Sequence, residues 1–254
     1  MVGGYDSDGK TTAAAFVYDG GRWSAAPAFP LALHHPGAAA LGDDVYVAGG
    51  FTDDTALKRV FVLPAGATSW REVAPLRQAR GALALIAVNG RLYAIGGRNG
   101  STEIAMVERY DPAANTWSDV VAMPRPRDHL AGYVDGASAC VAGGREPATS
   151  VSVDCLDTTN STWRSLPALP TPTSGAAAAL IDGAVLVAGG EPSGEGALIT
   201  IVQTLRNNTW TSEPMLEPRH GSGFALFGGR LWMCGGADRP NLHAVPSCTS
   251  IRPS

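Results

Sequence analysis

Arginine, histidine and carboxylate side chains recur at turn positions of this chain, where they could bind or transform a ligand. The set comprises Arg80, Arg98, Arg127, Asp128, His129, Arg145, Glu191, Arg219 and His220. Because the planar guanidinium fork matches the two oxygens of a carboxylate, the arginines predict recognition of an acidic group on a peptide or a sugar. Asp128 and Glu191 would orient these donors. The alternative is that these side chains only pair with one another and with loop backbone groups.

The four cysteines form two pairs along the sequence. Cys140 and Cys155 are 15 residues apart, and Cys234 and Cys248 are 14 apart. Neighbouring strands of one hairpin would bring such pairs within disulfide range. Four cysteines allow three connectivities, and only this local pairing stays within single repeats. Buried free thiols are the alternative.

A repeat carries these residues along the whole chain. Glycine pairs begin at Gly3, Gly49, Gly96, Gly143, Gly189 and Gly235, at intervals of 46 or 47 residues. The tryptophans Trp23, Trp70, Trp117, Trp163 and Trp210 keep the same period. Two independent marks in one phase, in units of short strands, indicate a β-propeller.

Each repeat contains the signals of a strand meander. A short apolar run such as Leu92–Ile95 precedes each glycine pair and predicts a buried strand. A two-residue turn such as Asn89-Gly90 precedes the run and predicts a hairpin. The strand before that turn, as in Ala176–Ala179, consists of small residues, which suits crowding at a central axis. We expect each tryptophan to begin the outermost strand and to pack against the neighbouring blade.

The pattern Gly96-Gly97, Asp111-Pro112 and Asn115-Thr116-Trp117 resembles the kelch-repeat family, and the resemblance covers essentially the full chain. It implies an all-β fold: a kelch-type β-propeller forming a single domain, 1–254. The repeats would span about 1–33, 34–76, 77–124, 125–170, 171–218 and 219–254. We expect six blades of four antiparallel strands with an incomplete seam at the N-terminus. The alternative is a five-bladed ring whose last blade combines 219–236 with 13–30.

A four-stranded meander also predicts which loops share a face. The link that enters the innermost strand and the loop after the glycine pair must lie on the same side of the ring. This side therefore collects the candidate residues, and propeller loops of this kind usually carry function. His35, His129 and His220 lie at comparable points of alternate repeats. Three imidazoles converging on the axis could bind a metal, although we favour capping or pocket-lining roles and expect neither a metal nor another cofactor.

Composition excludes several other classes of function. The net charge of −4 is scattered, without the basic stripe that nucleic-acid binding needs. No run of 18 apolar residues occurs, so we expect no membrane span. The start of the chain lacks the features of a signal peptide. Two disulfides would nevertheless favour an extracellular or periplasmic protein, its signal carried by an absent N-terminal segment, over a cytoplasmic one.

We therefore predict a monomeric binding module that recognises a protein segment or an acidic carbohydrate on the face rich in histidine and arginine. The resemblance to kelch proteins, which include a sialic-acid epimerase, implies the alternative of a sugar epimerase or mutarotase, an isomerase using general acid–base catalysis. It also implies a third alternative, an intracellular adaptor for ubiquitin-ligase substrates. Propellers host many activities, so the fold alone does not choose among them.

Overall fold

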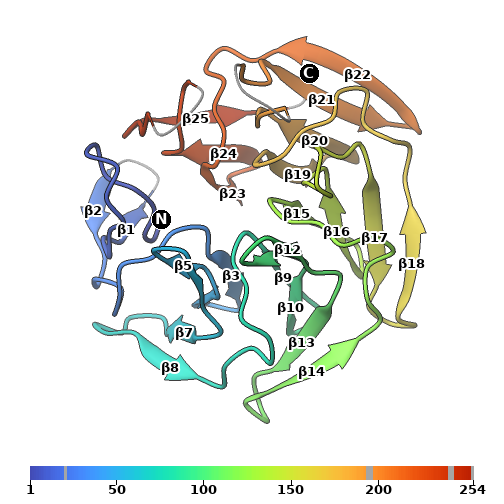
Figure 1. The fold of residues 1–254 in the computed structure, drawn as a ribbon. Helices are drawn as coiled ribbons and strands as arrows, with labels where there is room; N and C mark the ends of the chain where they lie inside the picture. The colour runs from blue at the N-terminus through green and yellow to red at the C-terminus, as the bar shows by residue number, and fades with distance from the viewer. Residues whose placement is uncertain (20–21, 193–196, 240–242, 253–254) are drawn as a thin grey trace.

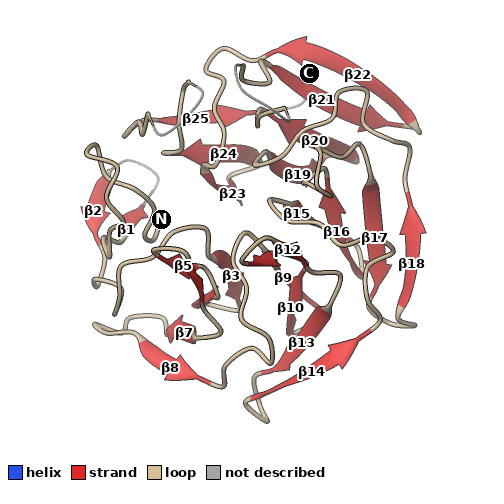
Figure 2. Cartoon of the chain, in the orientation of Figure 1, coloured by secondary structure: helices blue, strands red, loops and turns tan. Residues whose placement is uncertain are grey.

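The computed structural model describes residues 1–19, 22–192, 197–239 and 243–252, so the predicted loops 191–196 and 237–241 lie partly outside the described residues. All regular elements in these residues are β-strands, arranged as separate antiparallel sheets around a central axis (Figure 1, Figure 2). The all-β propeller predicted from the repeat is confirmed. The described residues include no helix that is long and apolar enough to cross a membrane.

Four sheets are complete blades of four strands, ordered from the axis outward. The first contains β3 (Gly37–Leu41), β4 (Asp44–Ala48), β7 (Val60–Leu63) and β8 (Arg71–Val73). The second contains β9 (Ala84–Val88), β10 (Arg91–Ile95), β13 (Val107–Asp111) and β14 (Thr116–Val120). The third contains β15 (Ala131–Asp135), β16 (Ser138–Ala142), β17 (Val153–Asp157) and β18 (Thr162–Ser165). The fourth contains β19 (Ala177–Ile181), β20 (Ala184–Ala188), β21 (Ile201–Arg206) and β22 (Thr209–Pro214).

The expectation of six four-stranded blades is wrong. A fifth blade in the described residues has three strands, β23 (Gly223–Phe227), β24 (Arg230–Cys234) and β25 (Cys248–Ile251). Two N-terminal strands, β1 (Phe16–Tyr18) and β2 (Trp23–Ala25), form a separate two-stranded sheet. The structure thus has five blades and a partial sheet between the last blade and the first complete one. The alternative blade combining 219–236 with 13–30 is also not formed.

The glycine pairs are the joints between blades. Gly49 has a φ of +64°, and an added Cβ would lie 2.3 Å from the carbonyl oxygen of Arg80 in the next blade. The following residue, Gly50, donates its N–H to that same carbonyl oxygen at 2.9 Å. The same hydrogen bond, from the N–H of the second glycine to a carbonyl of the following repeat, joins Gly4 to Leu33, Gly97 to Arg127, Gly144 to Thr173 and Gly190 to Arg219. Only glycine combines this conformation with so close an approach of another backbone.

The tryptophan ladder provides a second set of joints at the outer rim. The indole N–H of Trp117 donates to the carbonyl oxygen of Ala74, in the preceding blade, at 2.9 Å. Trp70, Trp163 and Trp210 make the equivalent bond to residues 42 or 43 positions earlier. The predicted packing of these side chains against neighbouring blades is therefore confirmed.

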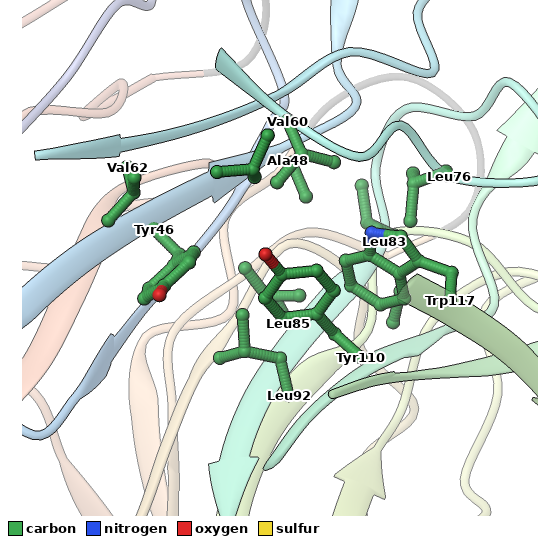
Figure 3. Packing of buried hydrophobic residues seen from close by; sticks show 12 residues of the cluster. Tyr46, Ala48, Val60, Val62, Leu76, Leu83, Leu85, Leu92, Tyr110 and Trp117 are labelled. Carbon is green, nitrogen blue, oxygen red and sulfur yellow. The ribbon is translucent and has the colours of Figure 1, made fainter. Parts of the chain in front are cut away.

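Apolar side chains fill the space between adjacent blades. In Figure 3, Tyr110 lies between Tyr46 of the preceding blade and Trp117 of its own blade, and all three belong to one cluster of buried residues. The rings of Tyr110 and Trp117 lie 5.0 Å apart, and the Tyr110 hydroxyl donates to Asn115. Burial between the blades, rather than within one sheet, forms the core.

The two predicted disulfides are present. Cys140 pairs with Cys155 across β16 and β17, and Cys234 pairs with Cys248 across β24 and β25. In each case the two cysteines are direct cross-strand partners. The local connectivity inferred from spacing is correct because the second and third strands of a blade are hydrogen-bonded neighbours.

Candidate functional site

One face of the ring, which we call the loop face, combines the links into the innermost strands with the loops after the glycine pairs. Isolated bridges join these two segments in five repeats: His34 with Phe51, Gly81 with Arg98, Asp128 with Arg145, Ser174 with Glu191 and His220 with Ala237. Two of the loops are short hairpins, β5 (Phe51–Thr52) with β6 (Thr55–Ala56), and β11 (Arg98–Asn99) with β12 (Thr102–Glu103). The predicted shared face is therefore correct.

A belt of backbone hydrogen bonds organises this face around the axis. The N–H of Ala82 donates to the carbonyl of His35, and that of His129 donates to the carbonyl of Ala82. Gly175 and Gly221 continue the series at 3.0 and 2.9 Å. All five residues have a φ between +51° and +61°. The series links equivalent positions of successive blades, so it holds the histidine side chains at defined places near the axis.

This belt of backbone hydrogen bonds was not predicted from the sequence, although the sequence contains a signal for it. Gly175 and Gly221 mark the position as one that favours a left-handed backbone, and His35, Ala82 and His129 occupy it in the earlier repeats. Non-glycine residues adopt this conformation only where the surrounding structure holds them there. The alignment of repeats against one another, rather than any single repeat, would have revealed it.

Three of the predicted ligand-binding arginines lie inside the protein. Arg80 and Arg127 have no exposed surface and Arg219 is 2 % exposed. The Arg80 guanidinium donates to the carbonyls of Gly96 and Met106 and pairs with Glu108, which is also fully buried. Arg127 donates in the same way to Gly143 and Ser152 and pairs with Asp154 at 2.5 Å.

These contacts correct the ligand-binding role expected for Arg80, Arg127 and Arg219. Arg219 donates to the carbonyls of Gly235 and Ser247 and to the carboxylate of Glu217. Each guanidinium donates to the carbonyl oxygen of the first glycine of a pair, and also to a carbonyl oxygen that accepts the N–H of that same glycine. We assign them to the structure of the blades, because an interior side chain with these partners cannot reach a ligand on the surface.

The other predicted residues meet across blade boundaries on the loop face. Arg98 is 39 % exposed and lies 3.3 Å from a carboxylate oxygen of the buried Asp128. Arg145 pairs with Glu191 and donates to the Ser174 hydroxyl at 3.2 Å. Asp128 and Glu191 therefore contact the arginines, and their role in orienting these donors for a ligand stays a prediction. The alternative, in which the polar side chains pair with one another, therefore accounts for the contacts of Arg98 and Arg145.

His129 and His220 approach the same two carboxylates. The Nδ1 atom of His129 lies 2.9 Å from Asp128 Oδ1, and that of His220 lies 3.4 Å from Glu191 Oε2. Asp128 Oδ1 and His129 Nδ1 are buried and lack a geometrically well-formed hydrogen bond to the described residues. Each carboxylate therefore has an arginine from one blade and a histidine beside it, which makes the rim a mixed-charge surface.

An aromatic stack extends the rim outward. The rings of Tyr5 and His34 are stacked at 4.7 Å, and those of His34 and Phe51 at 5.5 Å. The Arg98 guanidinium lies over the Phe51 ring, 5.0 Å from the ring centre. Phe51 packs so closely on Gly81 that a Cβ there would lie 2.1 Å from the ring. Because Phe51 is held in this way, Arg98 has a defined position.

The stack forms one wall of an open groove of about 270 Å³. His34, Phe51, Asp53, Asp54, Arg98, Gly100 and Ser101 line the groove, which lies at the β5–β6 and β11–β12 hairpins. Small-molecule sites in proteins are usually larger and more enclosed, about 300–1,000 Å³. The groove has the size for one or two side chains of a bound segment, with an aromatic wall, a cation and two carboxylates.

The adjacent side chains of His34 and His35 contact each other on the loop face. His34 Nε2 contacts the carbonyl oxygen of Asp53 at 2.9 Å, so this nitrogen carries a hydrogen. His34 Nδ1 then accepts from His35 Nδ1, at 2.6 Å, when both rings are neutral. Burial, together with the charges of His129, His34, Arg98 and Arg145, holds the pKa of His35 well below its usual range. Burial also lowers the pKa of His34.

The three-histidine metal site considered above is not formed by the described residues. His35 and His129 approach each other with ring centres 5.1 Å apart, but His220 contacts Glu191 and the Arg239 carbonyl. The one group of three potential ligand atoms within metal-binding range in the described residues is Asp135 with Cys140 and Cys155. Both of those sulfurs are consumed in a disulfide, so this group is not a metal site either.

Comparison with known proteins agrees with the repeat. The family described as the KLHDC2/KLHL20/DRC7 Kelch-repeats domain matches residues 1–190. Human Kelch-like protein 33 is 34 % identical over 129 residues, which cover 48 % of this chain and 24 % of that protein. Human Kelch repeat and BTB domain-containing protein 13 is 38 % identical over 144 residues, or 54 % of this chain and 30 % of that protein.

Alpha-scruin of Limulus polyphemus is 30 % identical over 144 residues, which cover 54 % of this chain and 16 % of that protein. The chain spans less than a third of the length of each of these relatives. Among solved structures, that of YjhT superposes with a TM-score of 0.85 at 17 % identity, over 94 % of this chain and 88 % of that one. This likeness concerns the fold alone.

Proposed function

Because this chain belongs to the kelch-repeat family, we propose that it is a protein-interaction module that binds an extended segment of a partner protein on its loop face. The observation that carries the proposal is the groove between the β5–β6 and β11–β12 hairpins. It is open at the surface and too small for a typical enclosed small-molecule site. An extended peptide would place one side chain in the groove and continue along the rim towards Arg145.

Two arginines give this surface its chemical preference. The Nε atom of Arg98 pairs with Asp128, and its Nη1 atom donates to the carbonyl of Gly100. The Nε atom of Arg145 donates to the Ser174 hydroxyl, and its Nη2 atom pairs with Glu191. In the part of the chain that the structure describes, each retains one terminal nitrogen that faces no protein acceptor. A carboxylate of the partner would pair with such a nitrogen. The segment is therefore expected to carry acidic residues, with an apolar residue for the wall formed by Phe51.

The two disulfides support a location outside the cytosol, as disulfides persist in oxidising compartments. The partner segment would then belong to an extracellular or periplasmic protein. An acidic carbohydrate and a sugar epimerase remain predictions of the sequence alone, and no contact described above favours them over a peptide.

Selection from a library of random 12-residue peptides tests the proposal. The immobilised protein is expected to enrich peptides that contain aspartate or glutamate near an aromatic or aliphatic residue. Arg145→Gln is expected to weaken binding of an enriched peptide by about tenfold, since a charge-assisted hydrogen bond contributes about 1.5–3 kcal/mol. Arg164→Gln is a matched control, because Arg164, in the outermost strand β18, makes a similar exposed ion pair with Asp135. Equal weakening by both changes, or enrichment without acidic residues, would refute the proposed surface.

A further inference from the structure

His35 lies near the axis of the ring, where its imidazole meets side chains of several other segments. Its ring centre is 5.1 Å from that of His129, although Ala82 occupies the belt position between the two. The rings of Tyr5 and Phe51 lie 6.3 Å from that of His35. Because His35 and His129 belong to the belt of backbone hydrogen bonds, the ring holds both imidazoles in place.

His35 lacks the acidic neighbour that other histidines of this chain have. In the part of the chain that the structure describes, three histidines lie within 3.4 Å of a carboxylate oxygen: His129 beside Asp128, His220 beside Glu191 and His243 beside Asp238. Within the same residues, no ion pair involves His35. A carboxylate is therefore the partner that its imidazole is missing.

The hydrogen bonds of two adjacent histidines identify the nitrogen that can take a proton. His34 Nε2 donates to the carbonyl oxygen of Asp53, so neutral His34 accepts at Nδ1 the hydrogen of His35 Nδ1. The Nε2 atom of neutral His35 then carries no hydrogen, and no hydrogen bond among the described residues involves it. A proton from the solvent would bind at this Nε2 atom and leave the bond to His34 intact.

The charged and titratable groups around His35 come from several segments: Tyr5, His34, Arg98, Asp128, His129 and Arg145. Burial raises the pKa of Tyr5 and lowers that of His34, so both side chains favour the neutral form. Asp128 already lies against Arg98 and His129. The remaining charges are those of the two guanidinium groups, which oppose a second positive charge nearby.

This balance changes when a carboxylate arrives. In the free protein, burial is the main cause that lowers the pKa of His35, and the charges of His129, His34, Arg98 and Arg145 add to it. A carboxylate that pairs with the free terminal nitrogen of either arginine would offset the repulsion and attract an imidazolium. Bound carboxylate and protonated His35 therefore stabilise each other.

We propose that the loop face takes up a proton at His35 when it binds the acidic segment, so that the affinity rises as the pH falls. This inference rests on the proposed function and adds the condition that regulates it. The pKa of His35 is higher in the complex than in the free protein, so the gain in affinity begins as the pH falls through the value of the complex. Carboxylates of the segment, with a pKa of about 4, remain charged in this range.

Titration calorimetry of the full chain with a selected acidic peptide tests this linkage. Measurements at pH 6.0 in MES and in Bis-tris, whose ionisation enthalpies differ, give the number of protons taken up with each peptide. An uptake of about 0.3–1 proton is expected, with a Kd about threefold to tenfold lower at pH 5.5 than at pH 7.5. The same peptide with amides in place of its carboxylates is expected to bind more weakly and without proton uptake.

His35→Asn removes the proton acceptor, and asparagine tolerates the positive φ of this position. This variant is expected to bind the peptide without proton uptake and with no gain in affinity at pH 5.5. His243→Asn is the matched control, since His243 is half exposed and already pairs with Asp238, and it is expected to retain the wild-type linkage.

Circular dichroism at both pH values establishes that each variant is folded. Binding that still depends on Arg145, but shows neither proton uptake nor a pH dependence, would overturn this inference and leave the proposed function intact. Proton uptake that persists in His35→Asn would overturn it as well, because another group would then take the proton. Failure of every selected peptide to bind would overturn the proposed function and this inference together.

Discussion

At the scale of single residues, equivalent buried positions of successive blades carry different pairs of side chains. Arg80 pairs with Glu108 inside the second complete blade, and both side chains are fully buried. In the blade before it, the positions 47 residues earlier are Leu33 and Phe61, which pack in an apolar cluster. The fourth complete blade uses Thr173 and Gln203, whose neutral groups bond to nearby backbone atoms. A charged, an apolar and a neutral polar pair thus occupy equivalent sites.

This comparison predicts a non-additive mutant cycle. Glu108→Phe alone is expected to destabilise the protein by about 3–5 kcal/mol, because it leaves the Arg80 charge buried without its partner. Arg80→Leu alone is expected to cost a similar amount. The double change reproduces the pair found at Leu33 and Phe61 and is expected to cost much less than the sum of the single changes. Urea denaturation of the four proteins measures this; additive losses would show that the pairs are not interchangeable.

His35 predicts the pH dependence of stability. Burial and the neighbouring cationic groups lower the pKa of His35 in the folded protein below the value of about 6.5 expected when it is unfolded. The unfolded chain therefore takes up the proton first as the pH falls. The stability contributed by the neutral imidazole is present above pH 6.5 and is lost below it, by at most about 1.4 kcal/mol per pH unit.

Urea midpoints at pH 7.5 and 5.5 test this dependence. His35→Asn is expected to reduce the loss of stability at pH 5.5, and asparagine tolerates the positive φ of this position. His243→Asn serves as the control, since the His243 side chain is half exposed, and it is expected to retain the wild-type dependence. An unchanged pH profile in His35→Asn would contradict the assignment.

At the scale of elements, recurring hydrogen bonds join each complete blade to its neighbour. Five of the glycine pairs donate an N–H to a backbone carbonyl of the following blade. Trp70, Trp117, Trp163 and Trp210 each donate their indole N–H to a carbonyl that lies 42 or 43 residues earlier. Trp117 is buried between Tyr110 and the preceding blade. Trp117→Ala is expected to destabilise the protein by about 3–5 kcal/mol, as truncations of large buried side chains do. Trp23→Ala removes a side chain that is 39 % exposed and should cost clearly less; equal melting temperatures for the two variants would contradict this view.

The disulfides are a second element-scale feature. Both connect the second strand of a blade to the third, and the loops that they close contain about 15 residues. Closure of such a loop stabilises a protein by about 3 kcal/mol in the chain-entropy account. Mass spectrometry after alkylation under denaturing conditions is expected to show no modified cysteine before reduction and four after it. Alkylation of all four without reduction would place the protein in a reducing compartment.

The repeat made these elements predictable, but it did not predict the positions and contacts of individual side chains. The spacing of glycine pairs and tryptophans determines the strands, the order within a blade and the loops that share a face. It does not distinguish Arg127, which points into its blade, from Arg145, which lies on the rim, because both are polar residues in turns. The difference depends on an acidic partner in a distant strand, Asp154 for Arg127.

At the scale of the whole molecule, the ring presents two surfaces with different properties. The loop face carries the mixed-charge rim and the groove beside Phe51. The opposite face consists of short turns such as Gly42-Asp43 and Asn89-Gly90. An interaction module of this shape is expected to bind its partner on the loop face, because the hairpins there are the parts that the rigid ring holds out to solvent.

Hydrogen–deuterium exchange with a peptide selected on the protein tests this central claim most directly. The account predicts slower exchange in the hairpins 51–56 and 98–103 when the peptide is bound, with no change in the turns 42–44 and 89–91. Arg145→Gln should reduce the protection at the same peptide concentration without changing the exchange of the blade strands. Protection of the opposite turns, or of β23 and β1 at the seam instead of the hairpins, would contradict the claim that the loop face is the interaction surface.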